Sequence, residues 1–336
     1  MRRVLLAVSV LLALLPTAPA AAAPGDGAGP RATFGVRPIK DRPTFAYGAT
    51  PGGVFTDQVE VSNPGSTALT LRVYASDAFN PRAGGFDLLP AGAKPADVGS
   101  WVTMSRGSVT VPARGKVLVG FTLKVPTNAT PGDHSGGIVA SLSSVRSDVQ
   151  GNRVAVDQRV GARIYLRVSG ALQAALTVEG LTARFHPTLN PFGSSRATLT
   201  YRVRNTGNVR LGAKQHVTVG TIWGADRDAP GVVDLPEILP GNAVDVTTEV
   251  RSALPAIWLT SAVRTDPVAQ PGDQALAITA TTREHGFWAI SWTLLALVAA
   301  LIAVVVLSLR RRVRRRRGGP VAPVVPAVPA GANAPA

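Results

Sequence analysis

Asp133-His134-Ser135 is the group whose residue types come nearest to a catalytic set, because it contains an acid, an imidazole and a hydroxyl. In a nucleophilic triad these three groups converge in space, whereas consecutive residues of an extended chain point to opposite sides. Thr130-Pro131-Gly132-Asp133 has the composition of a turn, and residues 138–142 alternate as in a strand. We therefore interpret the group as a turn that leads into a strand.

No other pattern in the sequence predicts catalysis, a cofactor or a metal site. The histidines are His134, His186, His216 and His285. None lies in an H-E-x-x-H spacing, and cysteine is absent, so we expect no zinc site. There is no G-x-S-x-G elbow, and the glycines lie in turns rather than before a helix. We predict a protein that is not an enzyme and binds no cofactor or metal.

Aromatic and basic side chains of the first half are the candidates for ligand binding. Residues 79–86 have the composition of a long loop between strands, and binding residues commonly lie in such loops. Most aromatics are expected to fill a core, and arginines near loops would meet anionic groups. The candidate residues are Phe79, Arg82, Phe86, Trp101, Arg106 and Arg114.

An apolar segment near the C-terminal end predicts a membrane anchor. Residues 288–309 contain no charge, glycine or proline, and as a helix they would reach about 33 Å, close to the hydrocarbon thickness of a bilayer. Residues 310–317 contain seven arginines, and excess basic residues mark the cytoplasmic side. We predict a single-pass cell-membrane protein whose Arg-rich and Pro/Ala-rich tail, residues 310–336, is cytoplasmic.

The other end of the chain predicts export. Arg2 and Arg3 precede an apolar run over residues 4–15, and Ala20-Ala21-Ala22 offers an A-x-A cleavage site. This order is typical of a secretory signal peptide, which we assign to residues 1–22. Both ends therefore predict that the region before Trp288 is extracellular.

Much of the net charge of +15 comes from the basic residues of the predicted signal peptide and cytoplasmic tail, which direct export and membrane orientation. Without Arg2, Arg3 and the seven arginines of the tail, 26 basic and 20 acidic residues remain, a net charge of +6. Nucleic acid is therefore not an expected partner. The absence of cysteine means that no disulfide supports the exported region. The 30 arginines against five lysines indicate a high-GC, actinobacterial genome.

The region between the two apolar segments predicts an all-β fold. Alternating runs such as Val117 to Val125 are separated by turn residues, and Asn63-Pro64-Gly65-Ser66 reads as a hairpin. A similar pattern surrounds Asn205-Thr206-Gly207 in the second half. We predict two tandem Ig-like β-sandwich domains, residues 33–169 and 171–283, followed by the transmembrane helix. A single large sandwich is the weaker alternative.

Several motifs of the first half resemble a known family. They are Val36-Arg37-Pro38, Val61-Ser62-Asn63-Pro64-Gly65, Trp101-Val102, Val111-Pro112-Ala113, Pro131-Gly132-Asp133-His134-Ser135-Gly136-Gly137-Ile138 and Arg159-Val160-Gly161-Ala162-Arg163-Ile164-Tyr165-Leu166. Over residues 34–169 the chain is similar to the peptidoglycan-binding N-terminal domain of WxL-interacting surface proteins. The resemblance implies an Ig-like domain that binds peptidoglycan, a second domain that serves a protein ligand, and a C-terminal span with a basic tail.

Two functions follow as hypotheses, with a third kept open. The first is a membrane-anchored surface protein of a Gram-positive bacterium that binds peptidoglycan or another cell-wall polymer, with another surface protein as a further candidate partner. The second is an adhesin or structural stalk that binds proteins without glycan contact. The third, a secreted hydrolase, would need a deep polar pocket around His134 or His186.

Overall fold

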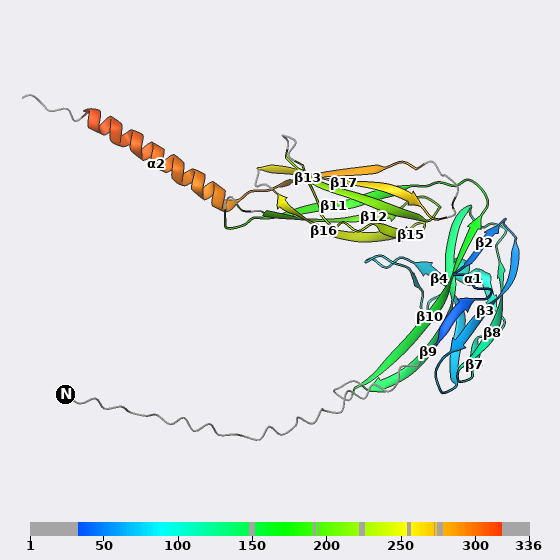
Figure 1. Cartoon of the computed structure of the whole chain (residues 1–336). Helices are drawn as coiled ribbons and strands as arrows, with labels where there is room; N and C mark the ends of the chain where they lie inside the picture. Colours follow the sequence, from blue (N-terminus) through cyan, green and yellow to red (C-terminus); the bar gives the residue numbers. More distant parts are fainter. Residues whose placement is uncertain are drawn as a thin grey trace, which may run out of the picture.

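The chain is mostly β, with several sheets and one long apolar helix at its C-terminal end (Figure 1). The computed structural model describes residues 33–147, 152–190, 193, 195–221, 226–253, 257–271, 273 and 278–317. The predicted β character and the C-terminal helix are confirmed. The predicted signal peptide, residues 1–22, and the tail beyond residue 317 lie outside the described residues.

Residues 33–169, the first unit, form two sheets in the orders β1-β3-β8-β6 and β2-β10-β9-β4-β5, with β7 paired to β4. The elements are β1 (Gly35–Pro38), β2 (Phe45–Ala49), β3 (Val54–Asn63), β4 (Leu69–Phe79), β5 (Asp87–Leu88), α1 (Val98–Trp101), β6 (Val102–Met104), β7 (Ser108–Val111), β8 (Gly115–Lys124), β9 (Gly132–Ser147) and β10 (Arg153–Val168).

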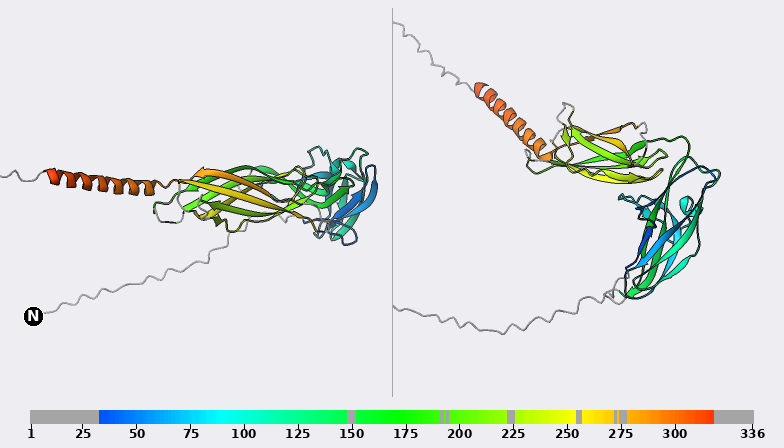
Figure 2. Two further views of the ribbon diagram at one scale, coloured as in Figure 1. Left: turned by 90° about the horizontal axis from the view of Figure 1, so that it is seen from above. Right: turned by 45° about the vertical axis from the view of Figure 1, so that its right-hand side comes forward.

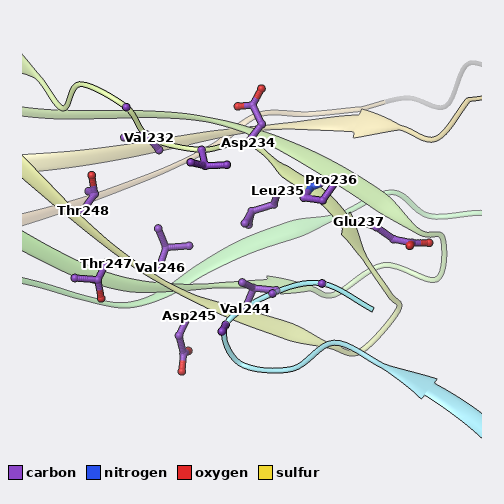
Figure 3. A pocket seen from close by; sticks show the side chains of 15 residues that line it. Val232, Asp234, Leu235, Pro236, Glu237, Val244, Asp245, Val246, Thr247 and Thr248 are labelled. Carbon is purple, nitrogen blue, oxygen red and sulfur yellow. The ribbon is translucent and has the colours of Figure 1, made fainter. Parts of the chain in front are cut away.

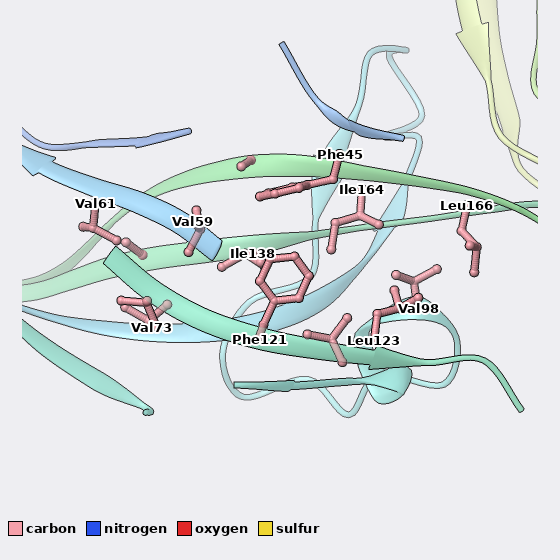
Figure 4. Close-up of a cluster of buried hydrophobic side chains, with 14 of the residues drawn as sticks. Phe45, Val59, Val61, Val73, Val98, Phe121, Leu123, Ile138, Ile164 and Leu166 are labelled. Atoms are coloured by element: carbon pink, nitrogen blue, oxygen red, sulfur yellow. The ribbon is translucent and has the colours of Figure 1, made fainter. Parts of the chain in front are cut away.

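The first core lies between these two sheets (Figure 4). The period-two run on β8 produces it directly, because Val119, Phe121 and Leu123 point inward and are buried. Phe121 meets Phe45 of the other sheet edge to face, with ring centroids 5.1 Å apart. Each such fully buried side chain contributes roughly 1.5–3 kcal/mol to folding.

Phe121→Ala is therefore expected to lower the free energy of unfolding by about 3–5 kcal/mol, since it removes a large buried side chain and leaves a cavity. Chemical denaturation of the full chain measures the change. Leu118→Ala is the matched control, because Leu118 lies on the same strand and is exposed; its effect should stay within about 0.5 kcal/mol. Equal effects of the two changes would contradict the burial of Phe121.

Residues 171–291, the second unit, form two sheets in the orders β11-β12-β16 and β14-β13-β17-β18, with β15 paired to β13. The strands are β11 (Leu176–His186), β12 (Ser195–Asn205), β13 (Leu211–Gly220), β14 (Arg227–Asp228), β15 (Leu235–Ile238), β16 (Ala243–Ala253), β17 (Trp258–Ala269) and β18 (Thr281–Trp288). A second, separate core includes Leu199, Tyr201 and Val263. The Tyr201 hydroxyl donates to Gln215 Oε1 at 2.7 Å, which satisfies its buried polar atom.

The predicted hairpin at Asn63 is wrong, because β3 and β4 belong to different sheets. The Asn63 amide Nδ2 donates to the carbonyl oxygens of Thr67 (2.8 Å), Val111 (3.1 Å) and Pro112 (3.1 Å), which fixes a corner between the two sheets. Asn205 makes the same corner in the second unit. Its Nδ2 donates to the carbonyl oxygens of Val209 (2.7 Å) and Ile238 (2.9 Å).

The apolar helix begins later than predicted. β18 continues to Trp288, and α2 (Trp292–Arg317) starts four residues further on. Its segment Trp292–Arg314 is long and apolar enough to cross a membrane.

Candidate functional site

The outer edge of β10 is the candidate site, because apolar side chains recur on its core-facing side beyond the core, with Gln158 as the one polar residue between them. Ala162, Ile164 and Leu166 are buried at alternate positions. The same face of the strand carries Val156 and Val154, which are 37% and 46% exposed. Apolar side chains with core spacing therefore lie in solvent at the N-terminal part of β10.

The backbone of this edge is only partly covered. β2 runs parallel to β10 and pairs with residues 164–168. Among the described strands no other pairs with this edge, and β9 occupies the opposite edge along all sixteen residues of β10. Natural proteins usually block a long edge with proline, a bulge or a covering segment. The ladder between β9 and β10 has no register shift, and the segment contains no proline.

The opposite face of the β9 and β10 ribbon is polar and held in place. The Ser143 hydroxyl donates to Asp157 Oδ1 at 3.1 Å, and Arg159 Nη1 donates to the Leu88 carbonyl at 3.0 Å. Leu88 packs so closely on the ribbon that a Cβ at Gly137 or Gly161 would meet its Cδ1 at 2.6 Å. This face is therefore held in place by β5. Val154 and Val156, which we call the valine row, lie on the other face, at the exposed N-terminal part of β10.

A buried carboxylate ties the two units together next to the C-terminal end of β10. The Asp133 side chain is 4% exposed and accepts from Arg167 Nε (2.6 Å), Arg167 Nη2 (2.8 Å) and the Arg210 backbone N–H (2.8 Å). Arg167 also pairs with Asp273 at 2.9 Å. The hydrogen bonds to Asp133 raise the pKa of the Arg167 guanidinium, against the effect of its burial.

Gly132 makes this contact possible. Its φ is +123°, in the region that favours glycine, and a Cβ there would collide with the Asn208 carbonyl oxygen. The next residue, Asp133, donates its backbone N–H to that same oxygen at 2.7 Å. The predicted turn residue is therefore a point of backbone contact between the units.

Glu237 forms a second link between the units. It accepts from Arg210 Nη1 at 3.2 Å and from the Tyr165 hydroxyl at 3.0 Å, and Arg163 Nη1 lies 3.5 Å away. Arg210 stacks on the Tyr165 ring with its Cζ 3.8 Å from the centroid, and Arg163 lies 4.2 Å over Phe86. Burial raises the pKa of Tyr165, so its phenol stays a hydrogen-bond donor.

The predicted binding loop, residues 79–86, contacts the second unit. Asn80 Oδ1 accepts from the Leu239 N–H at 2.7 Å, and its Nδ2 donates to the Glu237 carbonyl at 3.1 Å. The Arg82 carbonyl accepts from the Asp245 N–H at 2.8 Å, which places the loop on the edge of β16. A groove of about 320 Å³ remains beside the loop, and the side chains of Leu235, Val244 and Val246 face one another there (Figure 3).

The six predicted ligand residues are therefore not assembled into one site. Phe79 is half-buried at the end of β4, and Arg82 contacts the second unit through its carbonyl. Phe86 packs against Tyr165 and Arg163 of β10, and Arg106 is exposed between β6 and β7. Trp101 is half-buried against the first core, with its ring 4.8 Å from that of His134. Arg114, at φ 50°, donates its N–H to Gly65 at the opposite end of β4.

Asp133, His134 and Ser135 lie in β9, so the imidazole points away from its two neighbours. His134 Nδ1 lies 2.8 Å from Asp97 Oδ1, and Nε2 lies 2.9 Å from the Thr130 carbonyl oxygen. Both partners are acceptors, so a protonated ring satisfies both. Burial opposes the charge, but the bonds to Asp97 and Thr130 raise the pKa of His134. Among the described residues, no group of three acids or histidines could hold a metal ion.

His134→Gln is expected to destabilise the chain most at acidic pH. A raised pKa in the folded state means that the stabilisation is fully present below the unfolded pKa of about 6.5 and is lost as pH rises through the folded pKa. The difference in unfolding free energy between wild type and variant, measured at a series of pH values, should decrease in that direction. A difference that grows with pH would contradict a protonated His134. His186→Gln, at an exposed position, is the control.

No family model and no curated protein matches this chain. Among solved structures it is similar to a chain of the chaperone and tip adhesin complex of CFA/I fimbriae biogenesis, with 11% identity, 75% of this chain and 99% of that chain covered, and a TM-score of 0.39. It is also similar to the CupB2 chaperone of Pseudomonas aeruginosa, with 11% identity, 74% of this chain and 99% of that chain covered, and a TM-score of 0.31. A third similar structure is that of the Salmonella enterica SafA pilin in complex with the SafB chaperone, with 11% identity, 78% of this chain and 98% of that chain covered, and a TM-score of 0.32.

The assignment to the WxL-interacting family is therefore wrong, and peptidoglycan or another cell-wall polymer is not supported as the partner. The alternative of an adhesin or stalk is not supported either. The motifs behind the resemblance have structural roles. Asn63 builds a corner that recurs at Asn205, Asp133 holds the second unit, and Gly136 and Gly137 allow close packing against Val98 and Leu88. None of these roles requires a glycan.

Proposed function

We propose that this chain is a membrane-anchored, non-enzymatic protein that captures an extended segment of another polypeptide on the outer edge of β10, in a chaperone-like role. The observation that carries the proposal is the partly covered edge of β10 beside the exposed Val154 and Val156. A ligand strand added there would gain backbone hydrogen bonds, and its alternate side chains would continue the core.

The proposal includes the architecture that would present this edge. Each pair of sheets is an Ig-like domain, residues 33–169 and 171–283, with α2 as a single membrane span, the two domains extracellular and the Arg-rich end cytoplasmic. The ion pairs of Asp133 and Glu237 support a fixed angle between the domains, which would hold the edge away from the membrane. Two of the similar solved structures contain a chaperone together with a tip adhesin or a pilin.

Site-specific photo-crosslinking in the native membrane tests the proposal. A photoreactive residue at Val156 should give a discrete crosslinked protein, while the same residue at Val145 should not. Val145 is an exposed valine of the same ribbon, but it lies opposite Ala155 and therefore points to the other face. Equal crosslinking from both positions, or none from Val156, would contradict capture on this face.

A further inference from the structure

We infer that the end of the second unit from which α2 leaves lies on the bilayer surface and binds anionic lipid headgroups. Figure 2 shows that α2 leaves the unit at the end opposite the first unit. The inference treats α2 as a membrane span and does not depend on strand addition at β10.

The connection to α2 is short and packed. Residues 289–291 separate β18 from α2, and Ala289 and Ser291 are buried. The Leu295 N–H donates to the Ser291 carbonyl at 3.0 Å, and Thr293 Oγ1 donates to the Thr188 carbonyl at 3.5 Å. Three extended residues span roughly 10 Å. The end of the unit therefore lies within the headgroup layer when α2 spans the membrane.

Large apolar side chains are exposed at this end. Leu189, in the loop after β11, is 90% exposed, and Ile257, before β17, is 74% exposed. Trp258 and Trp288 lie opposite each other on β17 and β18 and pack edge to face, with centroids 5.1 Å apart. Tryptophan is enriched where a membrane meets water, because its apolar ring and polar N–H suit that boundary. Trp292, exposed at the start of α2, continues the same surface.

A basic row lies beside the apolar residues. His186, Arg196 and Arg251 are register partners across β11, β12 and β16, and all three are exposed. Arg184 and Glu249 share a shallow groove with Arg196. Glu249 is the acid facing this groove, and no ion pair joins it to a described residue. The row ends two residues before Thr188, which contacts the start of α2. Its charge and position fit phosphate groups of anionic lipid.

Spin labels on the full-length chain test the contact, and the absence of cysteine removes any background label. The protein with Leu189→Cys, labelled and placed in lipid nanodiscs, should be accessible to oxygen and shielded from a water-soluble nickel complex. Val233→Cys is the matched control, since Val233 is exposed and apolar but lines the groove that the loop of the first unit also lines, with Gln215 in the middle of β13 as its hydrogen-bond partner. A Leu189 label as accessible to nickel as the Val233 label would overturn the inference.

Lipid composition tests the charge. Nanodiscs of phosphatidylcholine with phosphatidylglycerol should shield the Leu189 label more than phosphatidylcholine alone. The double variant Arg196→Gln and Arg251→Gln should remove this preference, by about fivefold per arginine. The double variant Arg106→Gln and Arg114→Gln, at exposed positions of the first unit, should leave it unchanged. The same shielding in both lipids, or a preference that survives the loss of Arg196 and Arg251, would overturn the inference.

Discussion

Asp133→Ala is expected to lower the free energy of unfolding by about 3 kcal/mol or more, because it removes the acceptor of a buried ion pair and leaves charged partners behind. Asp133 accepts from Arg167 and from the backbone of Arg210. Both arginines keep one other acid, Asp273 and Glu237, so the loss should lie near the lower end of the usual range of about 3–5 kcal/mol for such pairs. Chemical denaturation of the full chain measures it.

The same substitution should also loosen the angle between the units. Distances between spin labels placed on β8 and β13 should broaden in Asp133→Ala and stay narrow in the wild type. Asp157→Asn is the matched control, because Asp157 is an exposed acid whose arginine partner lies 3.9 Å away; such pairs contribute at most about 1 kcal/mol. If Asp133→Ala unfolded like Asp157→Asn, the carboxylate would not hold the units together.

Val154→Lys combined with Val156→Lys is expected to weaken peptide capture by roughly 100-fold or more, since burial of one valine contributes about 1.5–3 kcal/mol. The probe is a synthetic nonapeptide of alternating valine and threonine, and fluorescence anisotropy measures its binding to the full chain. The two lysines would place charge in the apolar row that the peptide must cover.

Val145→Lys is the control for this pair, because it adds charge to the same ribbon on the opposite face. Its peptide affinity should stay close to that of the wild type. Comparable losses from both faces would indicate a nonspecific effect of charge, and unchanged affinity in the double variant would remove the valine row from the binding surface.

The alternation of apolar residues predicted much of the fold. The alternation from Val117 to Leu123 predicted β8 and the side of it that faces the core. This was possible because a strand buries alternate side chains, so the pattern is contained in neighbouring residues. β18 was missed because its sequence, TTREHGFW, has no apolar alternation and leads directly to the apolar helix. Its residues pair with β17, and only that pairing makes them a strand.

The corner at Asn63 and the contacts of Asp133 could not be predicted from local sequence patterns, because their partners lie far away in the sequence. Asn63 bonds to Val111, 48 positions away, and Asp133 contacts Arg210, 77 positions away. A turn motif predicts where the chain bends, but it does not state which sheet the next strand joins. The loop at residues 79–86 was correctly placed between strands, but its contact with Glu237 and Leu239 depends on how the two units meet.

The edge of β10 was also hidden in the sequence. The sequence of residues 164–168 alternates as expected for a strand. Val156 and Val154 indicate a binding edge only once the structure shows that β2 pairs with residues 164–168 and no further. Uncovered edges are a property of sheet order rather than of any one segment.

Hydrogen exchange at the backbone amides of β10 tests capture by strand addition most directly. The full chain with the alternating peptide should show slower exchange at alternate amides of residues 153–163, whose outer edge β2 does not cover. The same peptide, N-methylated at alternate positions so that it cannot complete the ladder, should give no slowing. Slowing that is absent with the plain peptide, or equal with the methylated one, would contradict strand addition at this edge.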